Sequence, residues 1–251
     1  MNLAGVESMF RLFCVHGFLG RAQDWDSILP KNLQRQSWDL FSPQNQGKVT
    51  FSFQALAEQI NDDAALQSGP RVFVGYSFGG RVGLHSLVQR PEIWDAAVII
   101  SAHPGLKEAS EREMRMRSDE VWAGRFATQE WDSLMALWNS QSVFAGCEAP
   151  LRRESDFSRQ SLASALRGCS LGLQRDLRPE LSQLRVPILW VVGEQDRKFL
   201  DLGREVASLN SQAQLQMIPG ASHRAPWDRS EAFVERLREF LVEGAYSKMA
   251  E

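Results

Sequence analysis

The chain has 251 residues, which is the size of one large domain or of one domain that carries a subdomain. Hydrophobic residues make up 43% and charged residues 24%, an ordinary globular composition that argues against a disordered chain. The 28 lysines and arginines against 31 aspartates and glutamates leave a net charge of −3, so we do not expect the basic surface that non-specific nucleic-acid binding uses.

The cysteines and the N-terminus bear on the cellular compartment. Cys14, Cys147 and Cys169 lie far apart and in no CxxC pattern, which suggests a reducing compartment and no structural zinc. Residues 1–10 hold no basic region followed by an apolar run, and no apolar stretch approaches the ~18 residues that span a bilayer. We therefore expect a soluble, cytoplasmic protein without a metal, nucleic-acid or membrane partner.

Short apolar runs alternate with longer helical patterns along the chain. The runs are brief and apolar at most positions, as parallel strands covered on both faces must be. Strands are expected at residues 11–16, 71–76, 96–101 and 187–193, with a further strand at 214–218. Helices are expected at residues 52–65, 78–90, 200–208 and 230–243. This alternation predicts an α/β fold with a mainly parallel central sheet flanked by helices.

One long segment interrupts this rhythm. Residues 104–180 show helical patterns rich in Arg, Glu, Trp and Leu, without a convincing strand. A helical insertion between two strands of a sheet is typical of a lid that excludes water and shapes a substrate pocket. We therefore expect a core formed by residues 1–103 and 181–251, and a lid subdomain formed by residues 104–180.

A G-x-S-x-G motif joins a predicted strand to a predicted helix. The motif runs from Gly75 to Gly79, with Ser77 at its centre. In this setting the serine occupies a strained strand-to-helix turn, and the two glycines let neighbouring backbone pass without a Cβ clash. The helix N-terminus behind Ser77 favours negative charge near the hydroxyl. The motif therefore predicts a nucleophilic or basic serine.

A serine hydroxyl needs a histidine to accept its proton, and that histidine needs an acid to hold its tautomer. His223 follows the last predicted strand in a loop, and Asp196 follows the strand at 187–193. Both positions are at carboxyl ends of strands, where an open α/β sheet places its crevice. The order serine, acid, histidine is the one this strand–turn–helix motif has in its fold, and it predicts a triad. Asp201 and, less favourably, Glu194 are rival acids.

The other three histidines receive separate interpretations. His16 opens an H-G sequence after the first strand, which indicates an oxyanion-hole loop with the amides of Phe18 and Phe78 as the two donors. His16 itself is expected to be structural. His85 is expected to be a packed or surface residue of a helix, and His103 to belong to loop structure near the lid, with a pocket role as the alternative.

Several stretches resemble a known family. The whole chain resembles the α/β-hydrolase superfamily, and its stretches resemble the 2-succinyl-6-hydroxy-2,4-cyclohexadiene-1-carboxylate synthases of menaquinone biosynthesis. The stretches are HGFLGRAQDW (16–25), GYSFGGRVGLH (75–85), SAHPGL (101–106), WAGRF (122–126), LWNSQSVFA (137–145), ASALRGCSLGLQRDLRPEL (163–181) and GEQDRKF (193–199). GYSFGGR is common to several hydrolases, whereas QSVFA and SLGLQ-x-DL are particular to these synthases.

The resemblance implies an α/β-hydrolase fold with a helical lid and a lyase activity. In this family a substrate with a succinyl side chain, a ring carboxylate and an enolpyruvyl ether loses pyruvate by 2,5-elimination. Ser77, activated by His223 and Asp196, would take the proton α to the succinyl ketone, and the oxyanion hole would hold the resulting enolate. The partner is then a small molecule with several carboxylates, and no cofactor is implied.

The resemblance also implies which residues bind the substrate. Arg81 matches the family's arginine in GGR, and Arg125 in WAGRF matches a second one. Arg153 and Arg159 both compete for a third. Tyr76 and Trp138 match family residues beside the serine and near the substrate. Pro226 departs from the family, because a second histidine often stands at this position.

Two other functions remain as alternatives. An esterase or carbon–carbon bond hydrolase would use the same triad through a serine acyl intermediate. A binding protein with this fold and no catalysis would typically lack a triad residue, and here the sequence supplies all three, Ser77, Asp196 and His223.

Overall fold

The computed structural model describes residues 9–242. Six strands form one all-parallel sheet in the order β2-β1-β3-β4-β5-β6. The strands are β1 (Arg11–Val15), β2 (Gln34–Trp38), β3 (Arg71–Tyr76), β4 (Ala96–Ile100), β5 (Ile188–Gly193) and β6 (Ala213–Ile218). The expected α/β class and mainly parallel sheet are confirmed.

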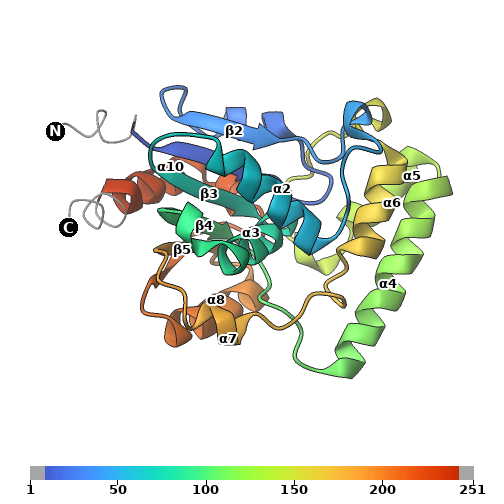
Figure 1. The fold of residues 1–251 in the computed structure, drawn as a ribbon. Coiled ribbons are helices and arrows are strands. Elements are labelled where there is room, and N and C mark those ends of the chain that lie inside the picture. Colours follow the sequence, from blue (N-terminus) through green and yellow to red (C-terminus); the bar gives the residue numbers. More distant parts are fainter. Residues whose placement is uncertain (1–8, 243–251) are drawn as a thin grey trace.

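Helices cover both faces of the sheet (Figure 1). Helices α2, α3, α7 and α8 contribute to the core on one face, and α9 and α10 to the core on the other. The helices of the core are α2 (Phe53–Ala65), α3 (Phe78–Gln89), α7 (Arg178–Leu181), α8 (Arg197–Leu209), α9 (Ala225–Asp228) and α10 (Ser230–Glu239). Helix α8 begins three residues before the expected range. Residue 243, the expected end of the last helix, and residues 1–8 of the N-terminal segment lie outside the described residues.

Strand β2 was missed by the sequence pattern. Its residues Gln34–Trp38 are mostly polar and are exposed or half-buried, because β2 is an edge strand that pairs only with β1. An edge strand does not need the continuous apolar run of a strand buried on both faces. The pattern used to find the central strands therefore could not detect it.

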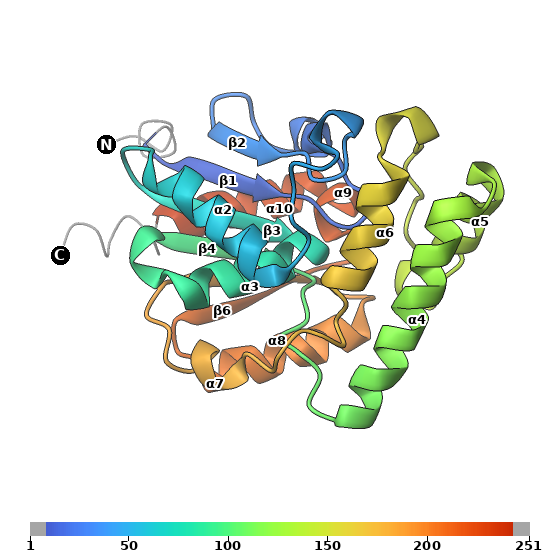
Figure 2. The same cartoon turned by 45° about the vertical axis from the view of Figure 1, so that its right-hand side comes forward.

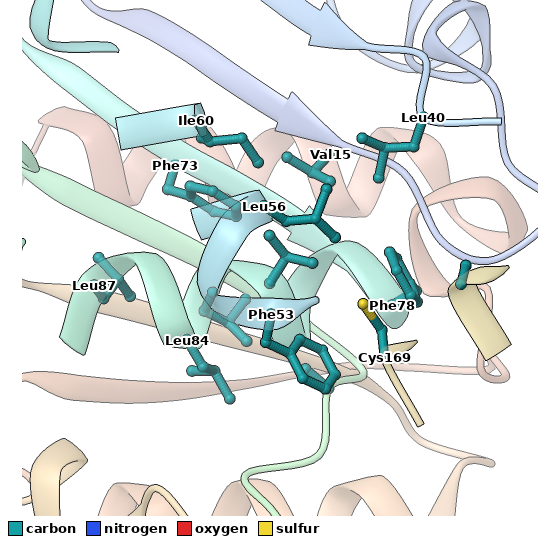
Figure 3. Packing of buried hydrophobic residues seen from close by; sticks show 14 of the residues in the cluster. Val15, Leu40, Phe53, Leu56, Ile60, Phe73, Phe78, Leu84, Leu87 and Cys169 are labelled. Carbon is teal, nitrogen blue, oxygen red and sulfur yellow. The ribbon is translucent and has the colours of Figure 1, made fainter. Parts of the chain in front are cut away.

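Alternating strand residues point to opposite faces and build two cores. Phe13, Phe73 and Trp190 belong to the core under α2, α3 and α8, whereas Leu12 and Val98 belong to the core under α10. Figure 3 shows the first core, where Phe53, Leu56 and Ile60 of α2 lie against the sheet and against α3. Both cores fix the strand ends from which the loops of the site emerge.

Three further helices fill the segment between β4 and β5. They are α4 (Ala109–Thr128), α5 (Trp131–Asn139) and α6 (Arg159–Gly168). In Figures 1 and 2 these helices stand together at the end of the sheet to which the arrowheads of β1 and β2 point, which is the carboxyl end of the parallel strands. Within residues 9–242, no helix is long and apolar enough to cross a membrane.

Candidate active site

Ser77 sits on a strained turn between β3 and α3. Its φ angle is +51°, in the left-handed region that side chains rarely adopt. The turn is held because the Ser77 amide donates to the carbonyl of Ile100 at 2.8 Å. It also requires glycine at position 79, where a Cβ would lie 2.1 Å from the carbonyl oxygen of Val15. This close approach fixes the serine at the carboxyl ends of the central strands.

The structure brings Ser77, His223 and Asp196 together. His223 Nε2 lies 3.1 Å from Ser77 Oγ, and His223 Nδ1 lies 2.6 Å from Asp196 Oδ2. The histidine and aspartate side chains are only 3% and 8% exposed, so the contacts are shielded from solvent. This is the geometry in which an aspartate holds the histidine tautomer and the histidine accepts the serine proton.

Neither rival acid reaches His223. Asp201 lies in α8, exposed to solvent, and its carboxylate pairs with Arg204 at 3.0 Å. Glu194 is exposed and accepts the backbone N–H of Gly220 at 2.8 Å. Of the three candidate acids, only Asp196 lies against the histidine.

His16 supports the loop that carries Phe18. The backbone N–H of Leu40 donates to His16 Nε2 at 3.1 Å, so the ring proton is on Nδ1, which donates to the carbonyl of Gly17 at 2.8 Å. Burial lowers the pKa of His16, which keeps the ring neutral. His16 therefore has a structural place, and among the described residues no carbonyl accepts from the amide of Phe18 or Phe78.

A cavity of about 1140 Å³ opens over the triad. Tyr76, Phe18 and Trp138, three of the residues expected at the site, are part of its wall. The Tyr76 ring lies 5.6 Å from that of His223, and Trp138 packs against Phe18 with ring centroids 4.9 Å apart. Burial raises the pKa of Tyr76, so its hydroxyl stays protonated.

Arg81 presents a half-buried positive charge to the cavity. It lies one turn after Ser77 on α3, and its guanidinium is 5.0 Å from the ring centroid of Phe53. One terminal nitrogen donates to the carbonyl of Cys169 at 3.0 Å. Burial, together with the nearby Arg115, lowers the pKa of Arg81 to about 10. The arginine is therefore poorly solvated, which favours an anionic ligand.

The other arginines predicted to bind substrate lie outside the cavity wall. Arg125 stacks on the ring of Trp122, with its guanidinium 5.0 Å from the ring centroid. Arg159 is held by Glu154 at 2.5 Å and by the carbonyls of Phe126 and Gln129. Arg153 does not line the cavity either. None of the three lines the cavity in this structure, and their contact with substrate stays a prediction.

Other cationic residues line the cavity, among them Arg115 and Lys198. Arg115, Ser118, Asp119 and Trp122 form a stripe with helical spacing along α4 that faces the cavity. Lys198 lies two residues after Asp196, in the first turn of α8. The spacing of seven residues between Arg115 and Trp122 could have indicated Arg115, and the GEQDRKF stretch contained Lys198. Neither was predicted as a site residue.

Two remaining histidines are now placed. His85 lies outside the cavity, its ring stacked on Phe53 at 4.6 Å, and burial lowers its pKa to about 4. His103 lines the cavity, as the alternative interpretation of this residue predicted. Within residues 9–242, no group of three or more His, Cys, Asp or Glu side chains could hold a metal ion.

Known proteins resemble this chain along most of its length. A model of the alpha/beta hydrolase family matches residues 12–236. The chain belongs to the alpha/beta hydrolase family. Within this family, the 2-succinyl-6-hydroxy-2,4-cyclohexadiene-1-carboxylate synthases of Serratia proteamaculans and Escherichia coli O1:K1 are 32% and 31% identical to the chain over 241 and 243 residues. These alignments cover 92% of this chain, and 92% and 93% of the relatives.

Solved structures agree with membership of the alpha/beta hydrolase family. MenH from S. aureus superimposes with a TM-score of 0.84 at 23% identity, over 94% of each chain. A thermophilic esterase from Thermogutta terrifontis superimposes with a TM-score of 0.70 at 19% identity, over 94% of this chain and 90% of the esterase. At these identities the likeness concerns the fold, which lyases and esterases share.

Proposed function

We propose that the protein is a 2-succinyl-6-hydroxy-2,4-cyclohexadiene-1-carboxylate synthase, a pyruvate-eliminating carbon–oxygen lyase of menaquinone biosynthesis. The observation that carries the proposal is the full-length similarity to curated synthases at 31–32% identity. The triad alone does not distinguish a lyase from a hydrolase, because the same three groups serve both reactions.

The cationic wall supports a substrate with several carboxylates. Arg81, Arg115 and Lys198 line the cavity that contains the triad. Arg115 uses its Nε to bind Asp119, while no described group accepts from the ammonium of Lys198. A guanidinium that is already partly desolvated binds a carboxylate strongly, because little water must be removed on binding.

The triad supplies the base of the reaction. His223 Nε2 accepts the proton of Ser77, and the serine oxygen then takes the proton α to the succinyl ketone of the substrate. Asp196 stabilises the imidazolium that forms, through the contact at 2.6 Å. The imidazolium of His223 then holds one proton until the leaving group departs, and no acyl-enzyme is formed.

The negative charge moves from the ketone to the leaving group. The amides of Phe18 and Phe78, which have no acceptor among the described residues, would donate to the enolate oxygen. Collapse of the enolate passes its electron pair through the ring and breaks the bond to the enolpyruvyl oxygen. Pyruvate leaves as its enolate, which takes up the proton that His223 holds, so the triad returns to its starting state.

Residues 104–180 act as a lid over this chemistry. Helices α4 and α5 contribute Trp122 and Trp138 to the cavity wall, and Trp138 packs on Phe18 of the core. A wall made from both the core and the insertion excludes water from the site, which protects the enolate and strengthens its hydrogen bonds.

Pyruvate release from the enolpyruvyl substrate tests the proposal. We expect the wild-type protein to release one pyruvate for each substrate consumed, measured with a coupled dehydrogenase assay. Parallel assays with simple activated esters test the hydrolase alternative, which predicts ester turnover and an acyl-serine. Ester turnover without pyruvate release by well-folded protein would overturn the proposal.

A further inference from the structure

The segment after β4 passes beside the nucleophilic turn. The Ser77 amide donates to Ile100, the last residue of β4. Ala102 packs against the first turn of α3, since a Cβ on Gly80 would lie 2.7 Å from the Ala102 Cβ. The residues on either side of Ala102, Ser101 and His103, line the cavity. Two polar side chains are thereby placed in the wall next to the triad.

Ser101 is buried without a hydrogen-bond partner. Its exposed fraction is 0%, and among the described residues no group pairs with its Oγ. The backbone is held in place, because the Ser101 amide donates to the carbonyl of Val191 at 2.9 Å, while φ is +46°. A buried hydroxyl without a partner costs free energy, and a native structure keeps such a group where a ligand or water uses it.

His103 presents a neutral donor to the same cavity. The backbone N–H of Gly105 donates to His103 Nδ1 at 3.0 Å, so the ring proton is on Nε2. Among the described residues, the side-chain hydrogen bond of His103 is the one at Nδ1, which leaves the Nε2–H free for a ligand. Burial, together with Lys198 and other cations, lowers the pKa of His103 to about 3, so the ring stays neutral and its tautomer stays fixed.

The two donors lie close to both the triad and the positive charges. Phe199 contacts the ring of His103 at 6.5 Å and the ring of His223 at 4.6 Å, so one aromatic ring separates the two histidines. Arg81 and Lys198 line the same cavity and bear electrostatically on His103. A ligand oxygen at this place would meet neutral donors inside a positive field, which favours an anion.

We propose that Ser101 Oγ–H and His103 Nε2–H together bind one carboxylate of the substrate, as a neutral donor pair that fixes its orientation beside the cations. The proposal rests on the proposed function, because that reaction supplies a substrate with several carboxylates. Arg81 and Lys198 attract the carboxylate by their positive charge. The donor pair orients it, since the energy of a hydrogen bond depends on angle more than that of a charge–charge interaction does.

Binding of a stable dicarboxylate tests the pair without turnover. The probe is 2-succinylbenzoate, which carries a succinyl carboxylate and a ring carboxylate, titrated by isothermal calorimetry. We expect Ser101→Ala to weaken binding about tenfold while the urea midpoint stays equal or rises, because the hydroxyl has no protein partner to lose. Unchanged affinity in folded Ser101→Ala protein would overturn the role of Ser101.

His103 is tested by a matched pair of substitutions. We expect His103→Phe to weaken binding about tenfold or more, and His103→Gln, whose amide can donate from the place of Nε2, to stay within about threefold of wild type. His85→Phe is the control, because it also removes a half-buried neutral histidine near Arg81 but one outside the cavity. Equal affinities for His103→Phe and His85→Phe would contradict the proposal.

The same experiments separate this inference from the proposed function. If the wild-type protein binds 2-succinylbenzoate and the variants weaken binding as expected, but no pyruvate is released, the reaction is wrong and the donor pair stands. If pyruvate is released and neither Ser101→Ala nor His103→Phe changes KM or the affinity for the probe, the donor pair is wrong. Wild-type protein that does not bind the probe also overturns the pair.

Discussion

Arg152 binds both carboxylate oxygens of Asp24, at 2.9 and 2.6 Å. The pair joins the loop after β1 to the segment between α5 and α6, so it connects the core with the helical insertion across the edge of the cavity. The two side chains are only 13% and 16% exposed. A bidentate, poorly solvated pair of this kind holds its geometry more firmly than a surface ion pair.

We expect Asp24→Asn to lower the free energy of unfolding by about 1–3 kcal/mol, because it leaves a shielded arginine without its charged partner. Asp26→Asn is the matched control on the same turn, since Asp26 is 58% exposed where it pairs with Arg35. That substitution should cost less than about 1 kcal/mol. Urea unfolding of both variants measures the two losses of unfolding free energy. Equal losses would show that the Arg152–Asp24 pair stabilises the protein no more than an exposed ion pair does.

The triad predicts large losses of turnover. Ser77→Ala, His223→Ala and Asp196→Asn should each reduce kcat about 10²–10⁴-fold, because each removes a group from the proton-transfer chain. Asp201→Asn and Glu194→Gln should leave kcat unchanged, since neither carboxylate reaches the histidine. Steady-state pyruvate release measures all five variants. A larger loss for Asp201→Asn than for Asp196→Asn would refute the assignment of the acid.

The cavity wall distinguishes between two arginines that both match family motifs. Arg81→Ala should lower kcat/KM by about tenfold to a hundredfold, because it removes a partly desolvated charge from the wall. Arg125→Ala should change kcat/KM less than about threefold, since Arg125 stacks on Trp122 and does not line the cavity. Both are measured by pyruvate release at several substrate concentrations. A large loss for Arg125→Ala would mean that the insertion moves when substrate binds.

His85 predicts a pH dependence of stability. Its pKa in the folded protein is about 4 against 6.5 for an unperturbed histidine, so the unfolded chain binds more protons between these values. Its contribution to stability is therefore present above pH 6.5 and is lost as the pH falls toward 4. One proton changes the slope of unfolding free energy by about 1.4 kcal/mol per pH unit.

His85→Phe should therefore flatten the dependence of the urea-unfolding free energy on pH between pH 4 and 6.5. The slope of unfolding free energy against pH is the quantity to compare. A general loss of packing would lower the free energy equally at every pH and would leave this slope unaltered. An unchanged slope in the variant would contradict the burial of a neutral His85.

The glycine at position 79 is required by a close approach. Gly79→Ala should lower the unfolding free energy by about 1–3 kcal/mol or more, and reduce kcat, because its Cβ would meet the Val15 carbonyl at 2.1 Å. Gly124→Ala in α4 is the control, since nothing lies within 4 Å of its Cβ position. That substitution should stabilise the protein by about 0.5–1 kcal/mol. Thermal unfolding and pyruvate release report both effects.

Much of the fold and the chemistry was determined by sequence alone. Continuous apolar runs identified the four central strands β1, β3, β4 and β5, because central parallel strands are buried on both faces, and the fifth predicted strand, at residues 214–218, is the edge strand β6. The G-x-S-x-G motif specified the nucleophilic turn, since a Cβ on Gly79 would meet the Val15 carbonyl of β1 and a Cβ on Gly75 would meet the Gly79 carbonyl. The order of Ser77, Asp196 and His223 along strand ends followed from the topology of the sheet. Local pattern sufficed wherever burial or backbone geometry allowed few residue types.

Only the tertiary structure decided which polar residues face the cavity. Helix α4 is rich in Arg and Glu and has only three buried residues, so its sequence does not reveal that Arg115 lines the cavity whereas Arg125 does not. That orientation depends on how α4 packs against α6 and the core, through contacts far apart in the chain. The same holds for His103 and for the polar edge strand β2. An arginine or histidine tolerates many environments, so its place is set by the packing of the elements and not by its own neighbours in sequence.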